Sequence, residues 1–154
     1  SAQKLIHKQW RRPLPDCGRH DNLSREERYG TRDLAYSAWH RRQGRLLAYI
    51  DLDAIEVCAM CKQPLALIEL AQDVGQSGKA TTIIRQLARL ANLPAFLVFY
   101  SKDGSDKIIG FRVQQVMPEC GKQQSMTPGE YVEFLCALRD GHPCTQWNNP
   151  RSKK

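Results

Sequence analysis

Acidic residues inside apolar runs constrain this chain more than any other feature of its sequence. The stretch YIDLDAIEV holds Asp51 and Asp53, and the following PLALIELA holds Glu69. Burying an ionised carboxylate is costly unless the group pairs, hydrogen-bonds or binds a cation. The chain therefore needs a cation or basic partners at these positions, and surface arginines are one set of candidates.

The two acidic segments have the composition of neighbouring strands. RLLAYIDLDAIEV (45–57) and PLALIELA (64–71) are apolar and rich in branched residues, and the short CAMCKQ between them predicts an antiparallel hairpin. Because side chains alternate across a strand, Asp51 and Asp53 share one face of the first strand. The carboxylates of the two strands can therefore converge.

Helix and strand signals alternate along the rest of the chain. Ser24-x-x-Glu27 and Thr127-x-x-Glu130 are capping boxes that predict two helix starts. The remaining segments are a helix over 78–92 and strands over 93–101 and 107–116. The predicted order is helix, strand, strand, helix, strand, strand, helix, which indicates an α/β fold with a mixed β-sheet flanked by helices.

Length and charge limit the classes of protein and partner. With 154 residues and 42% hydrophobic side chains, the chain can form one domain with a core, and we expect a basic arm over 1–23, a domain over 24–140 and a polar basic tail over 141–154. The chain has neither a secretory signal nor an apolar membrane span, which favours a cytoplasmic location without a membrane partner. The net charge of +7 favours nucleic acid as a partner, although the same charge also keeps a protein soluble.

Three segments carry a family resemblance. YSAWHR, IDLDAIEV and LALIELA resemble small phage and prophage proteins of the PD-(D/E)XK nuclease superfamily, over roughly residues 31–116. The resemblance implies a restriction-endonuclease-like core. It further implies a metal-dependent DNA endonuclease of phage DNA metabolism, with branched or structured DNA as a substrate and the host cytoplasm as its location.

The resemblance also implies a set of metal ligands. Asp53 and Glu69 would bind Mg²⁺ or Mn²⁺ together with the backbone carbonyl of Leu70, and Asp51 competes for the first position. Oxygen ligands of this kind suit hard divalent cations. A cation held there would activate water for attack on a phosphodiester.

The chain departs from the family at one position. The family has a lysine two residues after the glutamate, where this chain has Ala71. Gln76 or Lys79, before the next helix, could replace that lysine; alternatively, Lys79 is simply a solvated residue at the start of a helix. The missing lysine keeps a second function open, a catalytically inactive module that binds DNA or a host protein. A homodimer would suit a branched substrate.

Cysteine spacing predicts a second metal site. Cys58-x-x-Cys61 lies at the expected hairpin tip, where two thiolates can bind one structural Zn²⁺. Cys17-x-x-His20 offers two further ligands, which would anchor the basic arm. Unliganded thiols or a redox pair are the simpler interpretation. The alternative ligands are Cys120, Cys136 and Cys144.

Basic residues mixed with aromatic ones predict a nucleic-acid surface. Arginines can contact phosphates while a tryptophan or histidine stacks on bases. Trp39 is predicted to be core instead, because it lies on the apolar stripe of its helix. The predicted DNA-binding residues are Trp10, Arg11, Arg12, His40, Arg41, Arg42 and Arg45.

Overall fold

The computed structural model describes residues 35–44 and 46–144. By contacts, the chain divides into two compact units, Ser1–Tyr49 and Ile50–Lys154. The described part of the first unit contains helix α2 (Ala35–Arg41). In it, the ring of Tyr36 lies 5.6 Å from that of Tyr49 and 5.8 Å from that of Trp39. Trp39 is 50% exposed, unlike the core residue expected from its position on the helical stripe.

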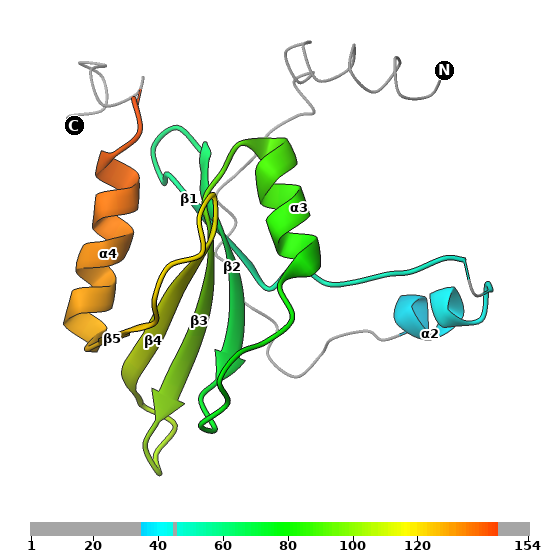
Figure 1. Cartoon of the computed structure of the whole chain (residues 1–154), viewed down its shortest axis with the longest axis horizontal. Coiled ribbons are helices and arrows are strands. Elements are labelled where there is room, and N and C mark those ends of the chain that lie inside the picture. The colour runs from blue at the N-terminus through cyan, green and yellow to red at the C-terminus, as the bar shows by residue number, and fades with distance from the viewer. Residues whose placement is uncertain (1–34, 45, 145–154) are drawn as a thin grey trace. The chain divides into compact units, whose positions relative to one another are not determined.

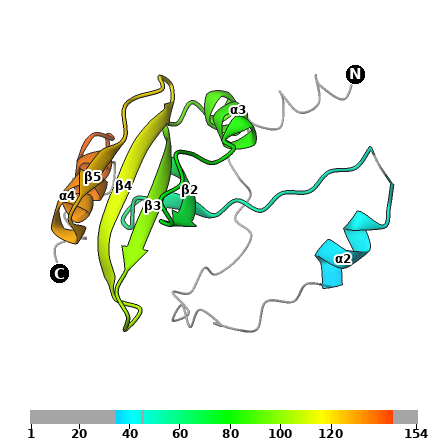
Figure 2. The same cartoon turned by 60° about the horizontal axis from the view of Figure 1, so that its bottom comes forward.

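The second unit is built on a five-stranded mixed sheet. Strands β2 and β3 are parallel and connected through α3, whereas the other neighbouring strands are antiparallel. Helices α3 and α4 lie on opposite faces of this sheet (Figure 1; Figure 2). The predicted α/β fold with a mixed, helix-flanked sheet is confirmed. In sheet order the strands are β1 (Ala54–Val57), β2 (Pro64–Gln72), β3 (Ala95–Lys102), β4 (Ile108–Met117) and β5 (Gln124–Met126), and the helices are α3 (Thr82–Ala91) and α4 (Pro128–Asp140).

Strand β1 is much shorter than the predicted strand over 45–57. Its pairing with β2 ends at Ala54 opposite Ile68. One step further, the backbone N–H of Leu70 donates to the side chain of Asp53 at 2.9 Å. The Asp53 carboxylate thus accepts the N–H that a backbone carbonyl of a longer β1 would have accepted, and the pairing of β1 with β2 ends there. The short β5 was not predicted, because three residues carry too little pattern.

Each face of the sheet carries its own core. Both faces of β2 and β3 are covered, so these strands have continuous buried runs instead of alternating ones. The buried residues on the α3 side are Leu67, Ile84, Ala88, Ala95, Leu97, Phe99 and Val116. Those on the α4 side are Ala66, Ile68, Phe96, Val98 and Val113, covered by Tyr131, Phe134, Leu135 and Leu138 of α4.

The helix ends follow their sequence signals. At the start of α4 the Thr127 side chain accepts from the Glu130 backbone N–H, and the Glu130 carboxylate accepts from the Thr127 backbone N–H. Helix α3 begins at Thr82 and is followed by Asn92 in the left-handed conformation, with φ of 54°. The two helices predicted after residue 78 are therefore present, and the capping box of α4 is confirmed. Ser24 and Glu27 of the other predicted capping box lie outside the described residues.

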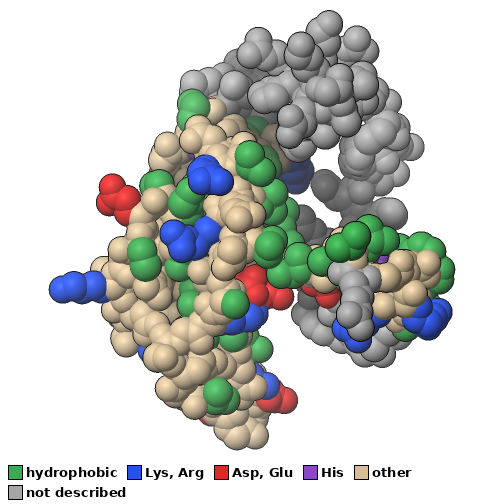
Figure 3. Space-filling view, turned by 45° about the vertical axis from the view of Figure 1, so that its right-hand side comes forward, with side chains coloured by type: hydrophobic (Ala, Val, Ile, Leu, Met, Phe, Trp, Pro, Cys, Tyr) green, Lys and Arg blue, Asp and Glu red, His purple; other side chains and the backbone are tan. Residues whose placement is uncertain are grey.

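Apolar side chains also remain on the surface. Leu90 of α3 is 83% exposed and Val74 is 79% exposed. Figure 3 shows hydrophobic and basic side chains next to one another on the surface. Among the described residues, no helix has the length and apolar character needed to cross a membrane.

Candidate functional site

Three charged side chains meet beside β2. The ammonium Nζ of Lys79 lies 2.5 Å from Glu69 Oε1 and 3.3 Å from Asp53 Oδ2. The same Nζ donates to the backbone carbonyl of Leu70 at 3.1 Å. Three oxygens, two from β2 and one from Asp53 just before β1, therefore surround one point, which the Lys79 ammonium occupies. We call Asp53, Glu69, Lys79 and the Leu70 carbonyl the acidic cluster.

The three charged members of the acidic cluster come from different local structures. Glu69 lies inside β2, pairs in register with Leu97 of β3, and is 9% exposed. Asp53 lies just before β1 and is held by the Leu70 backbone N–H. Lys79 comes from the loop between β2 and α3, so its reach to the strands depends on how that loop is held.

Arg112 of β4 holds this loop. Its Nε and Nη2 donate to the two carboxylate oxygens of Asp73 at 2.8 and 2.9 Å. Nη2 also donates to the Gln76 carbonyl at 2.8 Å, and the guanidinium lies 4.5 Å from the centroid of the Phe99 ring. Nη1 donates to Gln123, whose amide in turn donates to the carbonyl of Ser77. A bidentate arginine pair with further hydrogen bonds fixes both position and orientation.

These contacts set two pKa values. Burial of Lys79 opposes its charged form, but hydrogen bonds to Glu69 and Asp53 outweigh this effect and raise the pKa of Lys79 above its usual value. Lys79 is therefore an ammonium at neutral pH, a source of positive charge and not a base. Hydrogen bonds from Arg112 and from the Gly75 backbone N–H lower the pKa of Asp73 to about 2. The Asp73–Arg112 pair is therefore fully charged under ordinary conditions.

The other residues predicted for this site lie in different surroundings. The Gln76 side chain hydrogen-bonds the backbone just before it, donating to the Gln72 carbonyl at the end of β2 and accepting from the Val74 N–H. Ala71 is partly buried and packs against the core on the α3 side. Asp51 is exposed and precedes Asp53 in the chain. Of the two predicted replacements for the family lysine, Lys79 is the one that contacts both carboxylates.

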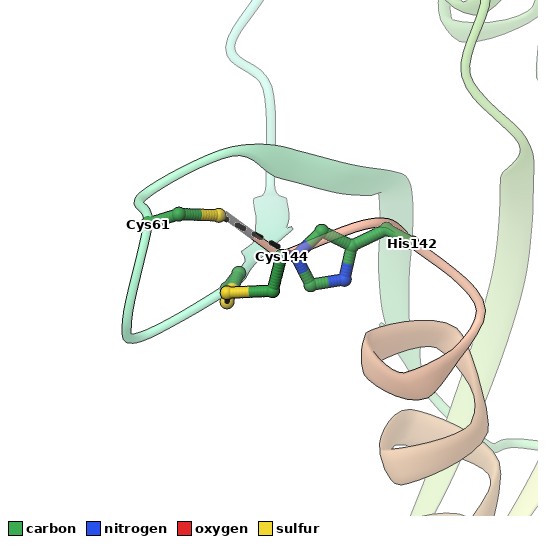
Figure 4. A group of neighbouring side chains, drawn as sticks. Cys61, His142 and Cys144 are labelled. Carbon is green, nitrogen blue, oxygen red and sulfur yellow. Dashed lines mark hydrogen bonds between the residues drawn. The ribbon is translucent and has the colours of Figure 1, made fainter. Parts of the chain in front are cut away.

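A second cluster lies at the turn between β1 and β2. Cys58 and Cys61 come from this turn, and His142 and Cys144 follow α4 (Figure 4). Their four ligand atoms all lie within 4.8 Å of one another. The cluster can bind a metal ion such as zinc, because three thiols and an imidazole are typical ligands of that ion. Cys58, Cys61, His142 and Cys144 are referred to as the cysteine cluster.

The cysteine cluster contains some of the predicted zinc ligands. Cys58 and Cys61 are present as predicted, and Cys144 was one of the alternative ligands. Cys17 and His20 lie outside the described residues. Cys136 in α4 and the exposed Cys120 are free cysteines outside the cluster.

Backbone amides surround the sulfur of Cys58. The N–H groups of Cys61 and Met60 hydrogen-bond this sulfur and lower the pKa of the Cys58 thiol to about 6, against the opposing effect of burial. Cys61 behaves differently. A hydrogen bond from the Gln63 backbone lowers its pKa, but burial and the neighbouring Cys58 and Cys144 outweigh it, so the pKa of Cys61 is raised. Cys58 therefore loses its proton first.

The predicted DNA-binding residues are described only in part. His40, Arg41 and Arg42 lie at the end of α2 and just after it, and both arginines are exposed. The His40 ring lies 5.6 Å from that of Tyr49. The structure does not describe Trp10, Arg11, Arg12 and Arg45.

Sequence reasoning missed three residues of these arrangements. His142 precedes Cys144 in a His-Pro-Cys sequence, a metal-ligand spacing that could have been recognised beside Cys58-x-x-Cys61. Arg112 and Asp73 carry no such signal. They are 39 residues apart, and only the pairing of strands brings them together.

Comparisons with protein-family models, with curated proteins and with solved structures found no match to this chain.

Proposed function

We propose that the chain is a metal-dependent DNA endonuclease that hydrolyses phosphodiester bonds at the acidic cluster. The proposal assigns the fold to the restriction-endonuclease-like arrangement implied by its PD-(D/E)XK resemblance. Branched or structured DNA in phage DNA metabolism is the substrate class, and Mg²⁺ or Mn²⁺ is the cofactor.

The observation that carries the proposal is the position of Lys79. Its Nζ lies 2.5 Å from Glu69 and 3.3 Å from Asp53. Lys79 reaches these carboxylates although this chain has Ala71 at the position where the family has its lysine. A lysine supplied from the following loop can therefore serve the same carboxylates as a lysine on the strand. This supports a relocated lysine over a lost one.

The ligand chemistry fits a hard divalent cation. Asp53 Oδ2, Glu69 Oε1 and the Leu70 carbonyl all lie within 3.3 Å of one point, now taken by Lys79 Nζ. Carboxylate and carbonyl oxygens are the ligands that Mg²⁺ and Mn²⁺ prefer. When bound, such a cation activates water and neutralises the charge that develops on the phosphate.

Lys79 has its own part in the proposed reaction. Its raised pKa keeps it an ammonium, so it donates hydrogen bonds and does not remove a proton from water. Its flexible side chain can exchange a carboxylate for a phosphate oxygen of the substrate. Lys79 would then stabilise the extra negative charge of the transition state, while Arg112 and Asp73 keep its loop in place.

One observation favours a second candidate, a catalytically inactive module that binds DNA or a host protein. Lys79 already neutralises Asp53 and Glu69, and the Leu70 N–H adds a hydrogen bond to Asp53. Because paired charges tolerate burial, the acidic cluster can exist without any metal. This candidate predicts DNA or protein binding without cleavage.

The test is cleavage of labelled linear, single-stranded and four-way-junction DNA in Mg²⁺ or Mn²⁺. Glu69→Gln removes a ligand charge, and Lys79→Met removes the ammonium but keeps much of the side-chain length. We expect each substitution to reduce the cleavage rate by about 100-fold or more, the scale associated with losing one stabilising group.

Two matched variants serve as controls. Lys102→Met removes a lysine that pairs with Asp106 at 2.7 Å, away from the acidic cluster. Glu133→Gln changes an exposed glutamate of α4. Both controls should cleave as wild type does, and circular dichroism should show all four variants folded. Absence of cleavage by wild type on every substrate, with DNA still bound, would reject the nuclease in favour of the binding module.

A further inference from the structure

We propose that the cysteine cluster is a structural Zn²⁺ site that joins the turn between β1 and β2 to the chain segment following α4. The proposal is independent of the nuclease. It rests on ligand chemistry, on distances between ligand atoms, and on the hydrogen bonds that orient them.

Two distances between ligand atoms match one tetrahedral ion, and all four atoms lie within 4.8 Å of one another. With Zn–S bonds of about 2.3 Å and Zn–N bonds of about 2.1 Å, tetrahedral angles place two sulfurs about 3.8 Å apart and a sulfur and a nitrogen about 3.6 Å apart. Cys58 Sγ and Cys144 Sγ are 3.8 Å apart, and Cys61 Sγ is 3.4 Å from His142 Nε2. The dashed line in Figure 4 marks the second of these contacts.

The histidine is oriented for a metal. The Nδ1–H of His142 donates to the backbone carbonyl of Arg139, in the last turn of α4. In the neutral ring this hydrogen bond places the proton on Nδ1 and leaves Nε2 as the ligand atom, and Nε2 lies 3.4 Å from Cys61 Sγ. Proteins usually fix the tautomer of a metal-binding histidine in this way, by a hydrogen bond from the ring nitrogen that does not bind the metal.

The cysteine turn is equally well formed. The Cys58 backbone N–H donates to the Gln63 carbonyl at 2.9 Å, and the Lys62 N–H donates to the Cys58 carbonyl at 2.8 Å. Lys62 adopts a left-handed conformation, with φ of 64°, which closes the turn. Backbone N–H groups also hydrogen-bond the Cys58 sulfur. Both cysteines thus belong to a turn that backbone hydrogen bonds already close.

Four protein ligands indicate a structural ion. A tetrahedral zinc with three thiolates and one imidazole has no position left for water or substrate, whereas catalytic zinc sites keep one open. Cys58 is also 1% exposed, so the ion would be shielded from bulk solvent on that side. The site therefore serves the fold and not the chemistry of a reaction.

The location explains why the fold gains from an ion there. Strand β1 has four residues at the edge of the sheet and pairs only with β2 among the described strands. The ligands are 81 and 86 residues apart in sequence, so one ion closes a very long loop. Links across long loops restrict the unfolded chain most. The ion would hold the hairpin, and with it Asp53, against the end of α4.

The test is the metal content of the full chain, purified under reducing conditions from cells grown with zinc. We expect about one zinc ion per chain by elemental analysis. Replacing zinc with Co²⁺ should give the visible bands of tetrahedral cobalt together with thiolate charge-transfer absorption. Removing zinc with a strong chelator should lower the melting temperature.

Cysteine variants locate the site. Cys144→Ser should lose most of the bound zinc, because it leaves three ligands of four. Cys120→Ser, which changes an exposed free cysteine outside the cluster, should keep it. Cys17→Ser tests the ligand expected from the sequence and should also keep the zinc. If Cys144→Ser does not fold, the cobalt spectrum of the wild type still reports the number of thiolates.

Three results would overturn the proposal. The first is wild-type protein that binds neither zinc nor cobalt. The second is a disulfide between Cys58 and Cys144 in protein isolated with its thiols trapped, since a disulfide would use two of the ligands. The third is zinc that persists in Cys144→Ser and disappears in Cys17→Ser, which would place the ion on the basic arm.

Discussion

Arg112 has more polar contacts than a surface arginine normally makes. It contacts both oxygens of Asp73, the Gln76 carbonyl and the Gln123 side chain, and it lies over the Phe99 ring. The contacts with Asp73 and Gln76 hold the loop that carries Lys79, and Gln123 adds its own hydrogen bond to the Ser77 carbonyl of that loop. A lysine could not make the bidentate pair, so this geometry requires arginine.

The Asp73–Arg112 pair predicts an acid-dependent loss of stability. The folded pKa of Asp73 is about 2, below its ordinary value of 3.8. The carboxylate therefore contributes fully to the free energy of unfolding above pH 3.8, and this contribution is lost as the pH falls towards 2. In Asp73→Asn the contribution is missing at every pH.

Urea unfolding of both proteins from pH 7 to pH 3 checks this prediction. Wild type should be the more stable at pH 7, and the difference should shrink below about pH 4. Asp140→Asn is the control, because Asp140 pairs with Arg139 at the exposed end of α4. A wild-type advantage over Asp73→Asn that stays constant down to pH 3 would contradict the assigned pKa.

At the scale of elements, helix α4 links several parts of the second unit. Its first turn is closed by the capping box, and its middle packs Phe134 against Phe96 with ring centroids 4.9 Å apart. Tyr131 stacks on Phe111 at 4.0 Å. After its last turn come His142 and Cys144. Helix α4 therefore connects the core on its side of the sheet to the chain segment that carries His142 and Cys144.

Thr127→Ala should destabilise the protein by about 1 kcal/mol, the usual cost of losing an N-cap side chain. The Glu130 backbone N–H would lose its partner, and the reciprocal arrangement of the capping box would be broken. The midpoint of urea unfolding measures the effect. Ser125→Ala, at an exposed position of β5, is the control and should change the midpoint little. An unchanged midpoint in Thr127→Ala would mean that the cap contributes nothing to stability.

At the scale of the whole molecule, positive charge dominates. The chain has 23 basic and 16 acidic side chains, and the described acidic groups include several that are already paired with lysine or arginine. Unpaired positive charge favours contact with phosphates, and such binding weakens steeply with salt because counterions are released. DNA is therefore the partner that we propose for this positively charged chain.

The basic end of α2 gives a prediction for this binding. Arg41→Gln combined with Arg42→Gln should weaken DNA binding and reduce the salt slope of the affinity by about 2, because each phosphate that an arginine neutralises adds about 0.9 to that slope. Fluorescence anisotropy over a range of salt concentrations measures the slope. Lys102→Gln combined with Lys122→Gln removes the same charge from the second unit, where Lys102 ends β3 and Lys122 lies between β4 and β5. Equal slopes for the two double variants would exclude specific phosphate contacts by α2.

Local patterns in the sequence determined the elements and part of each site. The capping box of α4, the periodicity of α3 and the apolar runs of β2 and β3 all act between residues that are close in the chain. The same locality allowed Cys58-x-x-Cys61 to be predicted as half of a candidate metal site. Lys79 was one of two residues proposed for the family lysine because it lies within reach of the strand end.

The tertiary structure alone decided which distant residues complete each site. His142 joins Cys61 across 81 residues, and Arg112 joins Asp73 across 39. Asp53 takes the N–H of Leu70, which ends β1 where the sequence predicts that the strand continues. Contacts of this kind depend on strand order, register and the packing of α4, which no pattern of neighbouring residues encodes.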